Sequence, residues 1–261
     1  MRVYWNMAIY EMKYALRYRA NIFFNTMSEM VAFFAFFLLW RTIFSINGTG
    51  WGYTFREMAT YYLISNFFFH HVPVCWNEFS WFVREGIMSN FLTRPLNLYY
   101  LYYSRTFGAK WAYMTSTVIF IASMYLIFGN FFVLPHNIAF ILLAILFWIG
   151  GGIIYYSASF WVEALSFWFE EVSGYSNVLF VIKSFLSGYL IPLNIVPFKK
   201  FLIYQPFNYV AYFPTRVFMG KVSYHEILYH FVAMLLWILT FWGTSLYVLK
   251  KGLVKYSAPG G

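Results

Sequence analysis

The sequence contains no aspartate, and all nine acidic residues are glutamates. Charged residues of both signs make up only 10% of the 261 residues, whereas a soluble domain carries about 25%. This scarcity excludes a water-soluble fold. Because aspartate is a common ligand of catalytic magnesium and a frequent general acid or base, its absence also argues against many enzyme mechanisms.

Cysteine and phosphate-binding glycine loops are equally scarce. Cys75 is the single cysteine, so an internal disulfide and a cysteine-based metal site are excluded. Gly220-Lys221 is the only Gly-Lys pair, and Thr215 stands where a P-loop would place its first glycine. The chain therefore cannot bind ATP through a P-loop of its own.

Apolar residues take the place of charge: they make up 62% of the chain, and the mean hydropathy is +0.61. The net charge of +9 could suggest nucleic acid, but phosphate binding needs a solvated basic patch. Here the charges instead interrupt long apolar runs. This pattern is typical of a membrane protein, and no nucleic-acid partner is expected.

A helix needs about 20 mostly apolar residues to cross a hydrocarbon core about 30 Å thick. Six stretches meet this requirement and predict an all-α membrane protein with six transmembrane helices. They cover roughly residues 22–46, 57–82, 99–129, 138–161, 174–196 and 226–249.

The distribution of lysine and arginine predicts the orientation. With six spans both termini lie on one side, which receives eleven of these residues against six on the other, while Lys183 falls inside a span. Since cytoplasmic segments carry the excess of positive charge, we expect both termini to be cytoplasmic. The predicted location is the plasma membrane, which the chain crosses several times.

Residues 1–20 predict an amphipathic helix that lies in the headgroup region before the first span. Its polar and apolar residues recur at intervals of three, four or seven, which places each set on one helix face. The polar face is Arg2, Asn6, Lys13 and Arg17, and the apolar face is Trp5, Ile9, Met12 and Leu16. The alternative is a simple basic flank to the first span.

The predicted cytoplasmic segment between the second and third spans, residues 84–96, reads REGIMSNFLTRPL. Pro95 ends its helical part and restricts Arg94 to an extended conformation. A short amphipathic helix at this place either lies on lipid or fits a groove of a soluble partner. Its apolar face consists of Ile87, Met88, Phe91 and Leu92.

Prolines and glycines interrupt apolar sequence after the fifth span, in FLSGYLIPLNIVP at 185–197 and QPFNYVAYFPTRVFMG at 205–220. Proline breaks helices, and broken backbone at membrane depth must be buried in protein or line a cavity. We therefore expect an external re-entrant helical region over residues 192–222, with a gate or lid role. The candidate gate residues are Gly188, Pro192, Pro197, Pro206 and Pro214.

Ionisable residues near or inside the spans are candidates for a substrate path. Lys183 lies near the predicted bilayer centre and should face protein or water; it either lines a cavity, pairs with Glu163 or Glu78, or snorkels to the interface. Glu78 and Glu163 form either a solvated rim or an acidic entrance that attracts cations. His70 and His71 lack metal-ligand spacing, so we expect helix-packing hydrogen bonds and no metal site.

The segment REGIMSNFLTRPL and the proline series that follows the fifth span resemble permease subunits of type-2 ATP-binding-cassette (ABC) exporters. The resemblance is to a poorly characterised bacterial branch of about the same length and covers essentially the whole chain. It implies a single permease domain, 1–261, that pairs with a second permease chain, identical or a sister subunit. ATP and magnesium would be bound by separate ATPase subunits, and this chain would need no cofactor.

In that resemblance residues 84–96 form the contact to the ATPase, and the N-terminal helix forms a second contact. The candidate coupling residues are Arg84, Glu85, Gly86, Met88, Phe91, Arg94 and Pro95. The expected cargo is a hydrophobic or amphipathic xenobiotic, cationic compounds included, because the chain is rich in aromatic residues. Alternatives are a lipid or glycolipid cargo, an intramembrane enzyme, and a secondary transporter, which would often show internal symmetry.

Overall fold

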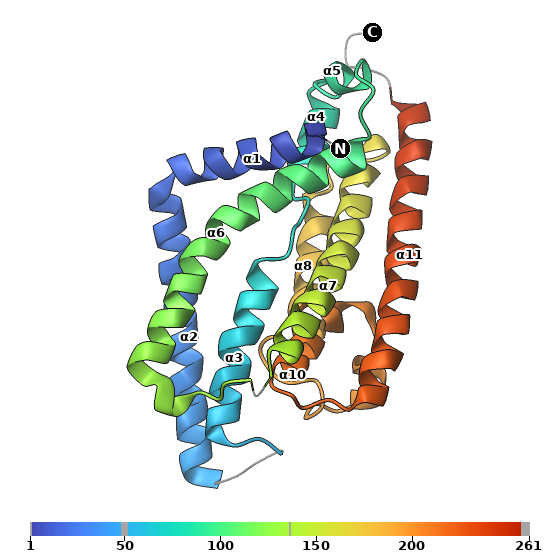
Figure 1. Cartoon of the computed structure of the whole chain (residues 1–261). Helices are drawn as coiled ribbons and strands as arrows, with labels where there is room; N and C mark the ends of the chain where they lie inside the picture. The colour runs from blue at the N-terminus through green and yellow to red at the C-terminus, as the bar shows by residue number, and fades with distance from the viewer. Residues whose placement is uncertain (1, 48–51, 136, 257–261) are drawn as a thin grey trace.

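The computed structural model describes residues 2–47, 52–135 and 137–256, and within these ranges it consists of helices and connecting segments without a β-strand. Both ends of the chain lie at the same end of an elongated helical bundle (Figure 1). We call this the terminal end, and the far end of the bundle the opposite end.

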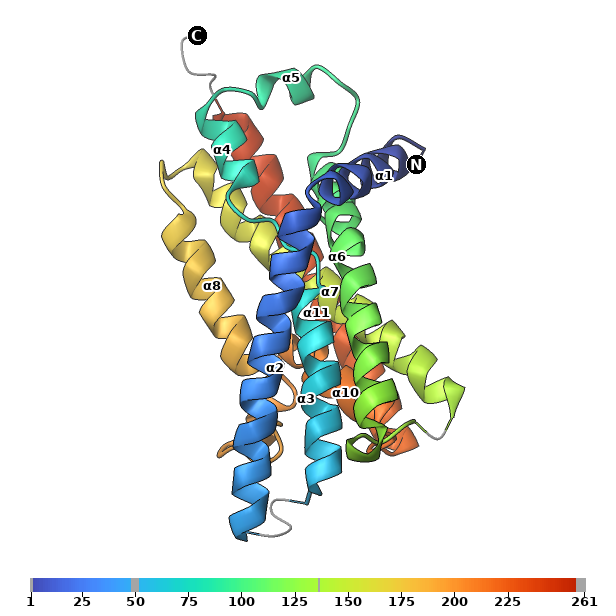
Figure 2. The same ribbon diagram turned by 90° about the vertical axis from the view of Figure 1, so that its left-hand side faces the viewer.

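The predicted amphipathic helix is present as α1 (Arg2–Arg17), which bends sharply at Tyr18 into α2 (Arg19–Asn47). Figure 2 shows α1 across the terminal end and α2 running from it to the opposite end. Protein covers the predicted apolar face only in part: Met12 packs on the cluster of Ala15, Ile22 and Ala112. Trp5 and Leu16 are 57% and 41% exposed, whereas Ala8 and Ala15 are buried.

Small residues explain how α1 packs on α6 (Leu98–Phe128). A Cβ added to Gly108 would lie 2.0 Å from the carbonyl oxygen of Ala8. Ala112, one turn after Gly108 on α6, packs on Ala15 of α1. Side chains without bulk let the two backbones touch, as in closely packed membrane helices. The contact holds α1 against the first half of α6.

Within the described ranges, four helices are long and apolar enough to cross a membrane: α2, α6, α7 (Ile138–Ala164) and α11 (Tyr224–Lys255). They agree to within a few residues with the predicted spans 22–46, 99–129 and 138–161, and α11 extends the span 226–249 at both ends. The all-helical membrane fold is therefore confirmed for these four segments.

The other two predicted spans are not continuous helices. α3 (Phe55–His70) and α8 (Ser173–Leu186) have 16 and 14 residues, or about 24 and 21 Å at 1.5 Å per residue. Each is shorter than a hydrocarbon core of about 30 Å. Pro73 cannot continue the hydrogen-bond ladder beyond α3, and a left-handed Gly188 (φ +71°) follows α8. Six spans therefore remain a prediction.

Short helices occupy the two ends of the bundle. After α3 the chain runs without regular structure to α4 (Glu78–Arg84) and α5 (Ser89–Leu92) at the terminal end (Figure 1). Beyond α8, at the opposite end, it forms α9 (Lys199–Leu202), the 3-10 helix η3 (Pro206–Val210) and α10 (Tyr212–Phe218).

The centre of the bundle is α7, which packs on α3, η3, α10 and α11. Its run Gly150-Gly151-Gly152 makes this possible. A Cβ on Gly151 would lie 2.0 Å from the carbonyl oxygen of Tyr209, and one on Gly150 would lie 2.2 Å from the sulfur of Met234. The glycines let η3 and α11 approach the α7 backbone.

Gly151→Ala is expected to destabilise the protein by about 1–3 kcal/mol, because the new methyl group overlaps backbone atoms that cannot rotate away. The measurement is thermal unfolding of the purified chain in detergent. Gly243→Ala on α11 is the matched control, since nothing lies within 4 Å of the added Cβ. Equal melting temperatures for the two variants would contradict the close approach of η3 to α7.

Candidate functional site

The predicted coupling segment, residues 84–96, lies at the terminal end and turns back on itself. Gly86, in the left-handed region at φ +70°, separates α4 from α5, a conformation that glycine adopts without strain. The amide of Met88 then donates to the carbonyl oxygen of Phe82 at 3.0 Å. This turn folds α5 back over α4.

One face of this segment is anchored in the protein. Met88 is fully buried, the ring of Phe91 stacks on that of Phe82 with centroids 5.5 Å apart, and Ser89 Oγ lies 3.2 Å from the hydroxyl of Tyr256 after α11. The other face is exposed. It carries Arg84, Glu85, Leu92, Thr93, Arg94 and Pro95.

A polar hollow of about 550 Å³ adjoins the exposed face, between α4, the 166–171 loop and the end of α11. Arg84 Nη1 and Glu171 Oε2 form an ion pair of 2.8 Å at its edge. The backbone amide of Ser173 also donates to Glu171 at 2.9 Å. These hydrogen bonds, Ser173 first and Arg84 second, hold the pKa of the Glu171 carboxyl below its ordinary value.

Glu163 of α7 supports α4 from inside the protein. Its fully buried carboxylate accepts hydrogen bonds from the backbone amides of Asn77 (2.9 Å) and Ser80 (3.2 Å) at the start of α4. The hydroxyl of Ser176 in α8 adds a third donor at 2.8 Å. A carboxylate at a helix N-terminus meets unpaired amides and the positive end of the helix dipole. Glu163 therefore fixes the coupling segment to α7 and α8.

Arg105 of α6 fixes the same segment to α1. Its guanidinium lies 2.8 Å from Glu11 of α1 and 2.5 Å from Glu78 of α4, and it packs over the ring of Phe82. Both Glu78 and Glu163 are thus held by protein donors in this structure. Their predicted role as an acidic entrance to a substrate path stays a prediction.

The end of α3 lies inside the bundle, where unpaired carbonyl groups would be costly. Four side-chain donors cover its last four carbonyls. They are His71 Nδ1 to Phe67 (2.8 Å), Trp148 Nε1 to Phe68 (2.9 Å), Lys183 Nζ to Phe69 (3.4 Å) and Lys110 Nζ to His70 (2.9 Å). Two cations therefore meet the negative end of a helix dipole.

Lys183 is almost completely buried, at 5% exposed. Its ammonium lies 3.7 Å from the ring centroid of Phe69 and 4.4 Å from that of Tyr155. Within the described residues Lys183 forms no ion pair with Glu78 or Glu163. Its ammonium is also buried among aromatic rings and does not extend to an interface, so it does not snorkel. Its position in a substrate path stays a prediction.

His71 makes the expected helix-packing hydrogen bonds, whereas the ring of His70 packs against Phe69 and Tyr189. His71 Nε2 lies 3.2 Å from the hydroxyl of Thr117 on α6, and that hydroxyl donates to Glu29 of α2 at 2.9 Å. The contacts join α2, α3 and α6. Among the residues that the structure describes, no three His, Cys or Glu side chains are grouped so as to hold a metal ion.

Two of the four candidate prolines after α8 lie at the start of short helices, whereas Pro192 and Pro197 lie outside the helices. Pro206 is the first residue of η3, and Pro214 lies in the first turn of α10. At these positions the N–H that proline lacks would have no intrahelical acceptor. Pro192 and Pro214 are buried, while Pro197 is exposed. η3 and α10 are almost entirely buried against α7 and α3.

Gly188 fixes the position of this region. A Cβ there would lie 2.8 Å from Leu193 and 2.9 Å from Tyr212. The hydroxyl of Tyr61 on α3 donates to the Gly188 carbonyl at 2.5 Å, and Ser65 donates to the next carbonyl at 3.0 Å. Two residues of α3 therefore hold the start of the candidate gate.

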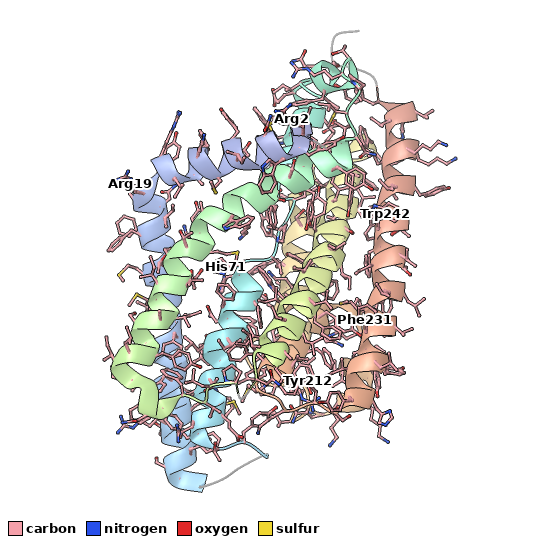
Figure 3. All side chains as sticks on the ribbon, viewed as in Figure 1. Arg2, Arg19, His71, Tyr212, Phe231 and Trp242 are labelled. Carbon is pink, nitrogen blue, oxygen red and sulfur yellow. The ribbon has the colours of Figure 1, made fainter. Side chains whose placement is uncertain are left out.

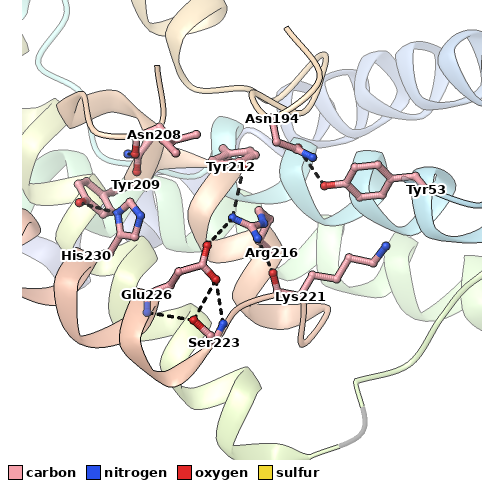
Figure 4. A network of polar contacts seen from close by, with 11 residues as sticks. Tyr53, Asn194, Asn208, Tyr209, Tyr212, Arg216, Lys221, Ser223, Glu226 and His230 are labelled. Carbon is pink, nitrogen blue, oxygen red and sulfur yellow. Dashed lines mark hydrogen bonds and ion pairs between the residues drawn. The ribbon is translucent and has the colours of Figure 1, made fainter. Parts of the chain in front are cut away.

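Ion pairs close the opposite end of the bundle. In Figure 4, Arg216 of α10 points toward Glu226 of α11, 3.4 Å away, and donates to the carbonyl of Lys221 at 2.6 Å. The Lys221 ammonium reaches Glu57 at the start of α3, 2.8 Å away. Arg216 and Lys221 thus bind the ends of α3, α10 and α11 together.

The sequence interpretation missed the roles of Arg105, Lys110 and Glu29. Arg105 and Lys110 are among the eleven lysines and arginines assigned to the cytoplasmic side, although both fall inside the predicted span 99–129. Glu29 likewise falls inside the span 22–46. An ionisable residue deep inside an apolar run must face protein or water, and this signal could have identified all three as interior contacts.

Glu163→Gln is expected to lower the free energy of local unfolding of the coupling segment by about 1–3 kcal/mol. The reason is that an amide NH₂ group would face one of the backbone amides of α4. The measurement is amide hydrogen exchange over residues 77–92 in detergent, which should become faster. Glu170→Gln, at an exposed site in the following loop, is the control. Unchanged exchange in Glu163→Gln would rule out the cap.

Comparison with known proteins identifies the family of the chain. A search of curated proteins gave no match. Residues 30–260 match the sequence model of the family described as ABC-2 family transporter protein. This range includes the C-terminal part of α2, the other three long helices, the coupling segment and the region after α8. The chain therefore belongs to the ABC-2 transporter family, as the resemblance indicated, and is a membrane-embedded permease subunit of an ABC transporter.

Proposed function

We propose that this permease works in an ATP-driven exporter, paired with a second permease chain and with separate ATPase subunits. The observation that carries the proposal is the division of residues 84–96 into a buried and an exposed face. Met88 and Phe91 anchor the segment, and its charged outer face remains available to a soluble partner. Both termini would be cytoplasmic, on the same side as this segment.

ATP-driven closure of the ATPases would press on α4 and α5. Movement would pass to α7 and α8 through Glu163, and to α1 and α6 through Arg105. It would reach α3 through the irregular segment that precedes α4. The cavity at the interface of the two permease chains would then narrow. This would push the cargo past the candidate gate at Gly188 and the prolines that follow.

The proposed cargo is a hydrophobic or amphipathic compound, such as a xenobiotic, with a lipid or glycolipid as the second candidate. Aromatic side chains dominate the interior of the bundle, which suits such molecules. A preference for cations would require Glu78 and Glu163 to leave their present donors during transport. An intramembrane enzyme is a weaker candidate, because the polar residues identified above hold helix ends.

The first test is capture of an ATPase. The tagged chain, co-expressed with a P-loop ATPase encoded next to its gene, should co-purify with it, and Arg94→Glu should reduce the captured amount by about tenfold through charge repulsion. Lys200→Glu, an equal charge reversal at the exposed opposite end, should capture as much as the unchanged chain. Capture unaffected by Arg94→Glu would refute the contact. Met88→Asp is unsuitable, since Met88 is buried.

The second test addresses Lys183. Lys183→Met should lower transport-coupled ATP hydrolysis of the reconstituted complex several-fold while ATPase capture stays normal, because the Phe69 carbonyl at the end of α3 loses its donor. Lys183→Arg keeps the charge and should retain most of the activity. Full activity of Lys183→Met would remove this residue from the mechanism.

A further inference from the structure

Three hollows meet at one residue of α6. The first, about 950 Å³, lies between α1 and α6; the second, about 270 Å³, between α6, α7 and α11; the third, about 230 Å³, between α6, α7 and the end of α3. Tyr103 lines all three, and Phe107 lines the first and the third. The three hollows therefore adjoin one another along α6, and they are called the α6 groove below.

The walls of the α6 groove are aromatic and apolar, and its charge has one sign. Aromatic lining residues include Tyr100, Phe107 and Trp148. Arg2 lines its outer end and Lys110 its inner end, and none of the described residues that line the three hollows is a glutamate. Complementarity of charge therefore favours an anion with an apolar tail.

Lys110 lies about three turns into α6, where it is partly buried. Its ammonium has three N–H donors, and one of them is used by the carbonyl of His70. Figure 3 shows the neighbouring His71 between α6 and α7. Glu29 is the carboxylate whose charge acts on Lys110, and it accepts a hydrogen bond from Thr117. Among the ion pairs of the described residues, none joins Glu29 to Lys110. Lys110 thus has donors to offer to a ligand.

We infer that the α6 groove binds an amphipathic anion, with its carboxylate or phosphate at Lys110 and its apolar tail against Tyr103 and Phe107. In the low dielectric of this interior an ammonium attracts an anion far more strongly than it does in water. Trp148 and Ile149 complete the apolar wall of the inner hollow. The inference rests on the proposed function only where it makes this ligand a cargo.

The test is binding of dansyl-undecanoic acid to the full chain in nanodiscs of zwitterionic lipid, followed by dansyl fluorescence. Its methyl ester tests the tail alone, and acetate and inorganic phosphate, as competitors, test the head alone. The acid should bind about tenfold more tightly than the ester, the gain of a charge-assisted hydrogen bond. Neither acetate nor phosphate should displace it. Equal affinities of acid and ester, or displacement by either small anion, would overturn the inference.

Variants assign the site. Lys110→Gln should lower the affinity for the acid by about tenfold and leave the affinity for the ester unchanged. Lys110→Arg should keep the affinity for the acid within about threefold of that of the unchanged chain. Ile149→Trp should fill the inner hollow and weaken both probes. Ile145→Trp, one turn away on the same helix and similarly exposed, should affect neither. Equal effects of the two tryptophans would overturn the location.

Two further outcomes separate this inference from others. If Ile149→Trp abolishes self-association in detergent without changing probe affinity, a second copy of the chain occupies the groove and the inference fails. If the chain captures an ATPase but shows no preference for the acid, the inference falls and the transport function stands. If it prefers the acid but captures no ATPase, the transport function alone falls.

Discussion

The whole arrangement depends on how α3 can end inside an apolar bundle. Carbonyl groups freed at a helix end cannot be left bare at membrane depth, where no water replaces the lost hydrogen bonds. Here the donors come from α6, α7, α8 and the residue that follows α3. Three helices are therefore tied to one helix end, and their mutual positions follow from it.

The few charged residues inside the bundle are placed at helix ends and helix junctions. Lys110 and Lys183 are used at the end of α3, Glu163 at the start of α4, and Arg105 where α1, α4 and α6 meet. A buried charge is tolerated when it meets a helix dipole, an opposite charge or an aromatic face. The few ionic residues of the interior thus connect helices to one another. The exposed ones are spread over α1, α2, the start of α3, the coupling segment, the loop before α8, α9 and the end of α11.

Local patterns in the sequence were sufficient for the four long helices and for the helix before α2. Apolar runs and helical spacing are properties of neighbouring residues, so one sequence shows them. The end of α3 was not predicted, although Pro73 was visible, because the donors that stabilise it lie far away in the chain. For the same reason the paired role of Arg105 was missed, and so was the contact of Ala8 with Gly108 of α6, which is distant in sequence.

α7 connects the proposed coupling site with the opposite end of the protein. It carries Glu163 at the start of α4, Trp148 at the end of α3 and Gly151 against η3. Because an α-helix is stiff along its axis and its contacts here are hydrogen bonds and close backbone packing, a shift of α4 cannot be absorbed at one site alone. It must either move α7 as a body or break a buried cap. The first alternative costs fewer buried hydrogen bonds, so rigid-body movement of α7 against α3 and η3 is the physically favoured response to a push on residues 84–96.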